Sequence, residues 1–270
     1  MTKLSSRDIK KIIGAVTTVI AMGGAYLAKE GVNIPFLHKS NETPSKTVNQ
    51  GSTSNQDKTE LNQKEFKSGM AIKEDVNSGK STLNPSEWVG PKITYSPLDS
   101  ENRVGAATAY LTKENYGKSE GREGQKWSPT GWHNQALKVN GKRVFPQNRG
   151  HLIGYTMTFN LDNDGNKKTG ELGSIDNPKN LFSQSAYSNQ VTFQTYEEMV
   201  RTSIKKGSKV IYRVEPIFKD NELMARGLWA QAVSDTGDLN FNVYIYNVQP
   251  GVEFNYSTGT SKASPNFEVK

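Results

Sequence analysis

The sequence contains no cysteine among its 270 residues. This absence excludes a disulfide framework and every metal site built on thiolates. Histidine is also scarce, with three residues in the chain, which disfavours a zinc site with several imidazole ligands. Neither shortage affects a hard cation such as Mg²⁺, because its ligands are oxygen atoms.

Hydrophobic residues are few as well, at 34% of the chain, and much of the deficit falls in the first third. The part from about Leu83 onward carries all four tryptophans. A domain of that size buries roughly 70% of its unfolded surface and folds without covalent staples. We therefore predict one folded domain over residues 83–260 and a C-terminal tail over residues 261–270.

Acidic residues are outnumbered by basic ones, 27 against 34, which gives a formal net charge of +7. An excess of positive charge suits nucleic acid, an anionic membrane surface or a cell-wall polyanion as partner. Many basic proteins bind none of these, so the charge alone does not decide among them.

Residues 1–30 have the pattern of a signal peptide or a signal anchor. Four basic residues, Lys3, Arg7, Lys10 and Lys11, precede an apolar run from Ile12 to Ala28. This order keeps the N-terminus in the cytoplasm and exports the rest of the chain. The run is close to the lower limit for spanning a membrane, about 17 residues. We favour the anchor over cleavage, because no clear cleavage motif precedes a polar break. The protein is then expected outside a bacterial cell, secreted or anchored to the outer face of the cytoplasmic membrane.

Residues 31–82 are predicted to be a flexible polar tether, because a stretch this poor in apolar residues cannot offset its ordering entropy. Within it, the run from Ser78 to Thr82 superficially resembles a phosphate-binding loop. Glu74 stands where such a loop requires its first glycine, so we reject that interpretation.

The pattern of the remaining chain predicts an α+β domain with a central antiparallel sheet and packed helices. Residues 136–145 favour a hairpin that turns at Asn140-Gly141. Residues 188–206 favour a helix, with apolar residues at helical spacing and Gly207 as its stop. We also predict strands over residues 104–112, 149–159, 181–185, 209–214, 224–233, 239–248 and 252–256, and expect the strand over 239–248 to be buried on one face.

His151 is the first candidate for chemistry, because an imidazole that titrates near neutrality can accept a proton from a water that attacks phosphorus. The alternative is a core histidine bonded to the backbone. Two neighbours favour the catalytic role. Arg149 has no evident structural purpose there, and Gly150 lets a backbone or ligand approach closely.

Three polar residues downstream could complete a site. Asn180 follows a turn and could simply end it. Asn189 could cap the predicted helix or supply an amide oxygen to Mg²⁺, which takes only one or two protein ligands. Glu197, eight residues further on, would lie two turns along and roughly 80° around an α-helix. The alternative for Glu197 is a solvated surface glutamate.

These residues form an ordered set of motifs. The segment Asn148-Arg149-Gly150-His151 resembles the DRGH motif of the DNA/RNA non-specific endonucleases that have a ββα-metal finger. The segments 177–180 (NPKN) and 186–190 (AYSNQ) then occur with the spacing of that family. The resemblance covers about residues 102–256 and is closest to streptococcal DNA-uptake and secreted nucleases. It implies that a finger of strand, loop and helix carries the active site.

The resemblance also implies a role for each residue. His151 would be the general base, and Asn189 the direct protein ligand of Mg²⁺. Glu197 would hold a metal-bound water, Asn180 would support the base or the metal site, and Arg149 would stabilise charge or order the finger. The metal would offset charge in the transition state, and Mn²⁺ is a candidate substitute.

The chain departs from the family in some positions. Asn148 stands where many members have aspartate, so it can hydrogen-bond but supplies no negative charge. A further cation is expected near the phosphate, and Arg122 and Lys126, both close to Trp127 in the sequence, are the candidates for contacting DNA.

The stretch from Asn160 to Glu171 nearly matches a calcium-binding loop. It starts with Asn instead of Asp, has Lys167 where an apolar residue is expected, and lacks clear flanking helices. We predict a mobile loop inside the finger instead. We expect His133 to be a plain surface residue in another loop.

The sequence therefore predicts a magnesium-dependent, sequence-nonspecific endonuclease that hydrolyses DNA, with RNA as a second substrate. Scattered Lys and Arg side chains would contact the phosphate backbone, which carries no base information. The alternative is a non-catalytic cell-surface protein that binds or takes up DNA. Such a protein would share the charge and the anchor but would not need His151 together with Asn189.

Overall fold

The computed structural model describes residues 58–270. The predicted signal segment and about half of the predicted tether, residues 31–57, lie outside the described residues. Within the described part, no helix is both long enough and apolar enough to cross a membrane.

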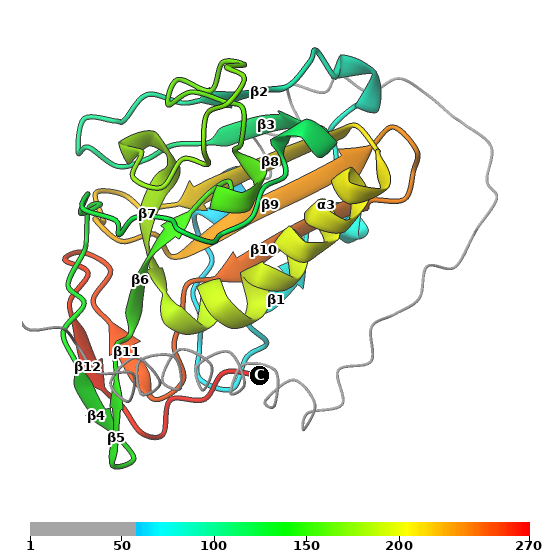
Figure 1. The fold of residues 1–270 in the computed structure, drawn as a ribbon. Helices are drawn as coiled ribbons and strands as arrows, with labels where there is room; N and C mark the ends of the chain where they lie inside the picture. The colour runs from blue at the N-terminus through cyan, green and yellow to red at the C-terminus, as the bar shows by residue number, and fades with distance from the viewer. Residues whose placement is uncertain (1–57) are drawn as a thin grey trace, which may run out of the picture. The chain divides into compact units, whose positions relative to one another are not determined.

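A six-stranded antiparallel sheet forms the centre of the fold, in the order β1-β10-β9-β8-β3-β2 (Figure 1). Its strands are β1 (Lys73–Asp75), β2 (Lys92–Tyr95), β3 (Ala107–Leu111), β8 (Val210–Ile217), β9 (Gly227–Ser234) and β10 (Asn240–Tyr246). Short 3-10 helices lie between strands, at Asn77–Gly79, Pro85–Glu87, Lys113–Asn115, Tyr155–Met157 and Pro178–Asn180. The predicted α+β class with a central antiparallel sheet is confirmed.

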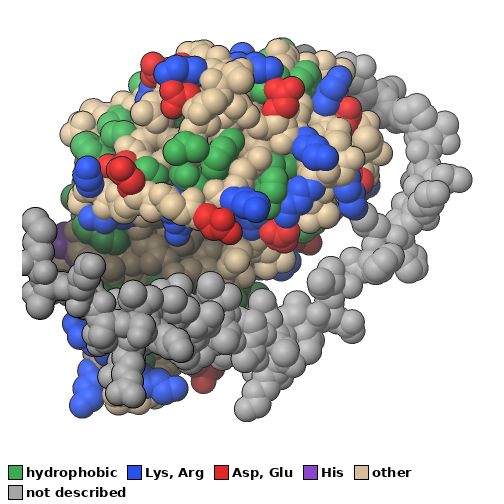
Figure 2. Space-filling model, viewed as in Figure 1, with side chains coloured by type: hydrophobic (Ala, Val, Ile, Leu, Met, Phe, Trp, Pro, Cys, Tyr) green, Lys and Arg blue, Asp and Glu red, His purple; other side chains and the backbone are tan. Residues whose placement is uncertain are grey.

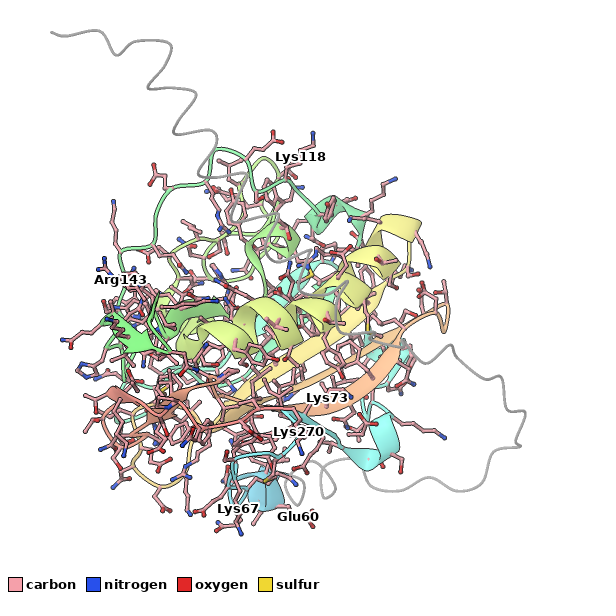
Figure 3. All side chains as sticks on the ribbon, turned by 90° about the horizontal axis from the view of Figure 1, so that it is seen from below. Glu60, Lys67, Lys73, Lys118, Arg143 and Lys270 are labelled. Carbon is pink, nitrogen blue, oxygen red and sulfur yellow. The ribbon has the colours of Figure 1, made fainter. Side chains whose placement is uncertain are left out.

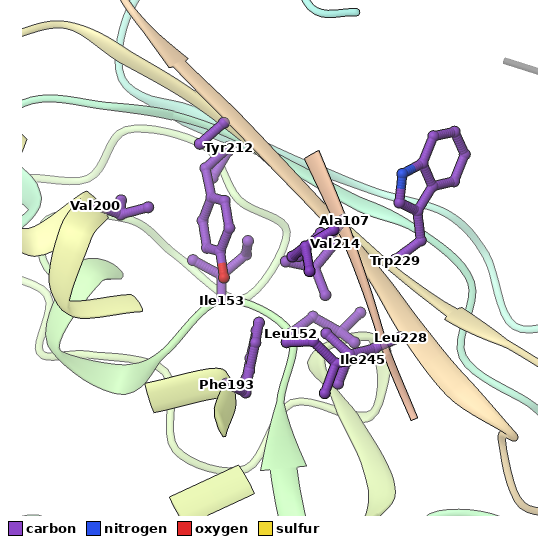
Figure 4. Packing of buried hydrophobic residues seen from close by; sticks show 14 of the residues in the cluster. Ala107, Leu152, Ile153, Phe193, Val200, Tyr212, Val214, Leu228, Trp229 and Ile245 are labelled. Carbon is purple, nitrogen blue, oxygen red and sulfur yellow. The ribbon is translucent and has the colours of Figure 1, made fainter. Parts of the chain in front are cut away.

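One helix, α3 (Gln194–Lys206), covers one face of this sheet. Its buried Val200 lies with Phe193 and Tyr212 on the same side of the strands, whereas Trp229 points to the other side (Figure 4). The helix ends at Gly207, which has a φ of 102°, a conformation that glycine adopts at little cost. The predicted helix over 188–206 is thus α-helical in its second part, and its first part, Ser188–Phe193, is a π-helix.

Residues predicted to belong to the tether pack against the sheet. β1 pairs with β10, and Thr82 donates from its backbone to Gln231 Oε1 at 2.9 Å. The strand β10 is buried on both faces from Phe241 to Tyr246, which corrects the prediction of a half-buried strand. The folded domain therefore begins before residue 83, within the segment that was predicted to be a tether.

The C-terminal residues also pack against the domain. The backbone N–H of Ile72 donates to the carbonyl oxygen of Lys270 at 2.8 Å, and Lys270 donates to Met70 at 3.0 Å. In addition, β12 (Ser261–Ala263) pairs with β11 (Val252–Phe254). The segment 261–270, predicted as a tail, is therefore hydrogen-bonded to the folded domain.

Two further strand pairs lie apart from the central sheet. The predicted hairpin is present as β4 (Leu137–Val139) and β5 (Lys142–Val144). Asn140 and Gly141 connect them with φ values of 47° and 78°, as a two-residue hairpin turn requires. The other pair is β6 (Gln147–His151) with β7 (Leu181–Ser185).

The strand predicted over residues 149–159 is wrong beyond His151. The chain leaves β6 there and forms the 3-10 helix Tyr155–Met157. The run Leu152-Ile153 is apolar because both side chains are fully buried in the core, beside Phe193 in Figure 4. An apolar run alone does not distinguish a strand from another buried segment.

Candidate active site

A finger of two strands and a helical segment carries the predicted site residues. β6 ends at His151, which lies opposite Leu181 of β7, and the chain continues from β7 into the π-helix and α3 (Figure 1). Asn247, just after β10, binds β7 through the N–H of Ser185 at 2.6 Å and the carbonyl oxygen of Ser183 at 3.0 Å. These bonds hold the finger against the central sheet.

Gln184 links the strand that carries His151 to the helical segment that carries Asn189. From β7, its Nε2 donates to Ser188 Oγ at 3.1 Å, while its Oε1 fills the space that a Cβ at Gly150 would need. The glycine before His151 is therefore required by the close approach of Gln184. Gln184 was not among the predicted residues, and only its place between the two asparagines could have indicated it.

His151 is partly exposed, and its Nε2 lies 3.1 Å from the carbonyl oxygen of Ile175. Burial lowers the pKa of the imidazole to about 4, the Ile175 carbonyl opposes this shift, and the charge of Arg122 adds to it. The imidazole is therefore neutral at neutral pH. An N–H on Nε2 that donates to Ile175 leaves Nδ1 as the nitrogen that can accept a proton.

Asn180 is fully buried and uses its whole amide to bind the chain just beyond His151. Its Oδ1 accepts from the N–H of Ile153 and its Nδ2 donates to the carbonyl oxygen of Ile153, each at 2.9 Å. Its own carbonyl oxygen accepts from Leu152 at 2.9 Å. These contacts favour the positioning role among the alternatives that the sequence left for Asn180.

Asn189 lies inside the π-helix and does not cap a helix. The residue at the cap position is Tyr187, and that end has no side-chain cap bond. Among residues 58–270, no partner binds the side-chain amide of Asn189, which is partly exposed. The capping alternative is therefore wrong, and the amide oxygen is available to a ligand. π-helical turns often occur at functional sites.

The π-helix changes the angle between Asn189 and Glu197. Its hydrogen bonds run from residue i to i+5, so each residue turns the chain by less than the 100° of an α-helix. The rotation about the helix axis from Asn189 to Glu197 is therefore smaller than the predicted two turns plus roughly 80°. Glu197 is thereby brought back toward the side of Asn189.

Glu197 is not a solvated surface glutamate. Its side chain is 14% exposed and lies 3.5 Å from Arg201, whereas that of the neighbouring Glu198 is 56% exposed. Burial raises the pKa of Glu197, and Arg201 partly offsets this shift. Its Oε1 occupies the space that a Cβ at Gly154 would need. The carboxylate therefore lies against the chain three residues after His151.

Arg149 joins β6 to the preceding loop and keeps its charge unpaired. Its guanidinium carbon is 4.6 Å from the centre of the Trp132 ring, and its Nη1 donates to the carbonyl oxygen of Gln125 at 3.0 Å. No carboxylate in the described structure pairs with it. The interactions support the finger-ordering role, and the unpaired charge suits a phosphate.

The loop that carries Arg122 and Lys126 is fixed beside the imidazole. Asp176 Oδ1 accepts from the backbone N–H groups of Lys126 at 3.0 Å and of Trp127 at 2.7 Å. Asp176 comes directly after Ile175, whose carbonyl faces His151. The charge of Arg122 influences the pKa of His151, whereas Lys126 is tied to this region by its backbone and has an exposed side chain.

In the stretch that resembles a calcium-binding loop, the carboxylate oxygen atoms bind other groups of the protein. Asp162 Oδ1 accepts from the N–H groups of Asp164 at 3.0 Å and of Asn166 at 2.9 Å, and Asp164 pairs with Lys179 at 2.7 Å. In the described chain, no three acidic or histidine residues are grouped so that they could hold a metal. The stretch is a loop, as predicted, and its acidic side chains bind partners within the protein.

Residues 81–236 match the family model of the DNA/RNA non-specific endonucleases. The chain belongs to the DNA/RNA non-specific endonuclease family. It is 25% identical over 227 residues to a deoxyribonuclease of Streptococcus dysgalactiae subsp. equisimilis, a match that covers 74% of this chain and 69% of that protein.

Solved structures agree with this assignment. NucA from Streptococcus agalactiae with no metal bound is 27% identical and superposes with a TM-score of 0.60, over 70% of this chain and 86% of NucA. The structure of NucA with a magnesium ion bound is 26% identical, with the same TM-score, over 70% of this chain and 85% of NucA. Sda1 nuclease with a bound zinc ion shares the fold, at 16% identity and a TM-score of 0.50. The chain is therefore a nuclease, and the non-catalytic alternative is set aside.

Proposed function

We propose that this nuclease hydrolyses phosphodiester bonds of DNA, and also of RNA, without sequence specificity and with Mg²⁺, using His151 as the general base. One observation carries the proposal. A neutral, partly exposed imidazole is oriented by the Ile175 carbonyl, on a finger that also presents the unpartnered amide of Asn189 and the carboxylate of Glu197.

The residues fit a magnesium ion. Asn189 offers an amide oxygen with no competing partner in the described structure and would be the direct ligand. Glu197 offers a carboxylate on a nearby side of the helical segment and would hold a water bound to the ion. One or two such oxygens suffice, because Mg²⁺ retains several of its waters. When bound, the ion supplies positive charge beside the reacting phosphate. Mn²⁺ accepts the same oxygen ligands, which supports it as a substitute.

The protein side chains would divide the remaining work. His151, as the neutral base, takes the proton of the water that attacks phosphorus. The bond from phosphorus to the 3′ oxygen breaks, and that oxygen takes a proton from water, which leaves a 5′-phosphate on the other product. The unpaired guanidinium of Arg149, together with Arg122, stabilises the negative charge that develops on the phosphate oxygens. Asn180 acts through the backbone of Ile153 and keeps His151 in place. All of these contacts are to phosphate, water or the protein's own backbone, which is compatible with both DNA and RNA.

A plasmid assay tests the proposal. Purified protein is incubated with supercoiled plasmid and Mg²⁺, with EDTA, and as the His151→Ala variant, with His133→Ala as the matched histidine control. We expect nicking with Mg²⁺, none with EDTA, a loss of about three orders of magnitude for His151→Ala, and near-normal activity for His133→Ala. Binding without nicking by the wild-type protein would refute the enzymatic mechanism. Near-normal activity of His151→Ala would refute the assigned base.

We also propose that the protein works outside the cell, tethered or released through residues 1–30. Basic residues before an apolar run support this location. Fractionation of cells that express the full chain, combined with N-terminal sequencing, tests it. An intact N-terminus in the membrane fraction supports the anchor, a trimmed protein in the medium supports a signal peptide, and a cytosolic protein contradicts both.

A further inference from the structure

The hairpin of β4 and β5 gathers positive charge without acidic neighbours in the sequence. Acidic residues make up 27 of 270 positions, yet there are none from Gly124 to Leu161, the stretch that contains the hairpin, β6 and His151. The hairpin itself carries Lys138, Lys142 and Arg143, all exposed. Figure 2 shows Lys and Arg side chains gathered where Figure 1 places β4 and β5.

Two of these cations face each other across the strands. Lys138 and Arg143 are direct partners in the register of β4 and β5. Like charges at directly opposite positions of an antiparallel pair destabilise it. Over residues 58–270, no carboxylate forms an ion pair with Lys138, Lys142 or Arg143. The opposed cations therefore destabilise the hairpin, and no carboxylate of the described residues offsets their repulsion. This indicates that an anionic molecule binds to them.

An exposed aromatic ring holds one of the two cations in place. The guanidinium carbon of Arg143 lies 4.9 Å from the centre of the Phe145 ring, and Phe145 is 50% exposed. Arginine and aromatic side chains together are typical of surfaces that bind nucleic acid. Arg143 lies at the edge of the molecule in Figure 3, with its side chain toward solvent.

The hairpin is anchored rather than loose. Val139 of β4 packs against Gly251, where a Cβ would clash with it. The turn at Asn140-Gly141 has the backbone conformation of a tight two-residue connection. Glu268 and Asn140 line the same groove, but within the described residues Glu268 forms no ion pair with the hairpin. The charges are thus presented on a fixed support.

We propose that the β4–β5 hairpin is a second contact for the phosphate backbone of the nucleic-acid substrate, beyond the bond that is cut. The proposal rests on the proposed function of the His151 site. The chain runs directly from Arg143 through β6 to His151, eight residues that span at most about 27 Å when extended. That distance corresponds to about eight phosphates along one strand of DNA. A substrate cut at His151 would then reach the hairpin within one helical turn.

The test compares two double variants with the same loss of charge. Lys138→Gln/Arg143→Gln removes the opposed cations of the hairpin. Lys67→Gln/Lys73→Gln removes two exposed cations that lie away from Arg143 (Figure 3). Binding to a 30-base-pair duplex is measured in EDTA by fluorescence anisotropy over a series of KCl concentrations, and plasmid cleavage is measured separately in Mg²⁺.

For the hairpin variant we expect Kd at 0.1 M salt to rise roughly ten-fold or more, and the slope of log K against log salt to become flatter by about two. The control variant keeps the wild-type slope. For cleavage, KM rises and kcat stays near the wild-type value, because the hairpin does not touch the reacting atoms. Thermal stability of the hairpin variant should equal or exceed that of the wild type, since a repulsion is removed.

Equal weakening of both variants would show that only net charge matters and would overturn the inference, as would no change in either. Loss of binding to vesicles that contain phosphatidylglycerol, with the DNA slope unchanged, would also overturn it, because the partner would then be a membrane. A wild-type protein that binds the duplex but fails to cut plasmid in Mg²⁺ would refute the proposed function instead. The two failures are therefore distinguishable.

Discussion

Asn180 holds Ile153 by both of its backbone groups, with two hydrogen bonds of 2.9 Å that are buried in the protein. The two residues are separated by 27 positions in the sequence. This pairing fixes the path of the chain just after His151, where β6 ends. It also explains why an amide is needed, since only a side chain with both a donor and an acceptor can bind both groups.

Replacing Asn180 by Ala should destabilise the protein strongly. The N–H and the carbonyl group of Ile153 would remain buried without partners, each at a cost of about 1–3 kcal/mol. We therefore expect the free energy of unfolding to fall by about 2–5 kcal/mol in urea titrations, together with a loss of nuclease activity. Asn180→Asp should not restore stability, because a buried carboxylate would face the carbonyl oxygen of Ile153 without a donor between them. A variant with full stability and no activity would instead place Asn180 at the metal.

The Asn189→Ala variant should behave in the opposite way. Its amide has no partner in the described structure, so the free energy of unfolding should change by less than about 0.5 kcal/mol. Removal of a metal ligand should reduce Mg²⁺ affinity by about 100-fold or more. Cleavage measured over a Mg²⁺ titration, and direct Mn²⁺ binding, check this. Destabilisation as large as that of Asn180→Ala would show that Asn189 is a structural residue.

The metal-free protein should lose stability as the pH falls from about 6.5 to about 4. The pKa of His151 is about 4 in the folded state, below the unfolded value of about 6.5. On acidification the unfolded chain therefore takes up a proton first. The contribution of the neutral imidazole to the free energy of unfolding is complete above pH 6.5. It falls by up to about 3 kcal/mol between pH 6.5 and pH 4.

Urea titrations of the wild type and of His151→Ala across these pH values measure that contribution as the difference between the two curves. The variant should have a flatter profile in this range. Parallel profiles would show that His151 has an ordinary pKa in the folded protein.

Gly154 should be required for activity although its backbone could accommodate alanine. Its φ of −58° and ψ of 143° are open to any residue, but a Cβ there would collide with Glu197 Oε1. Gly154→Ala should therefore displace the carboxylate and reduce kcat/KM by at least about ten-fold in plasmid assays. Gly124→Ala, where a Cβ meets nothing within 4 Å, is the control. Equal activity of the two variants would contradict a role for the position of Glu197.

Sequence patterns predicted an element correctly where the residues of that element alone determine its structure. β7 matches its predicted range of 181–185, and Asn140-Gly141 forms the predicted turn. The predictions failed where distant segments decide the outcome. The apolar run after His151 is not a strand, because Asn180 binds its backbone, and β1 lies in a polar stretch whose place in the sheet depends on pairing with β10.

The same distinction holds for the site. His151, Asn189 and Glu197 are candidates because of their residue types and because the motifs around them resemble the endonuclease family, and their roles stay predictions. Gln184, Ile175 and Asp176 were missed, because they act through an approach to Gly150, a carbonyl group and two backbone N–H groups. Such contacts exist only once the chain has folded, and the residue names do not reveal them.

Because Ser188–Phe193 is a π-helix, Asn189 and Glu197 can lie on nearly the same side of the helical segment although they are eight residues apart. An ordinary α-helix with seven residues from the amide to the carboxylate would turn by about 700°, only about 20° short of two full turns. Such a helix would present the pair to the same side without any widening. A homologue one residue shorter here can therefore have an equivalent site, and searches for this pair should accept either spacing.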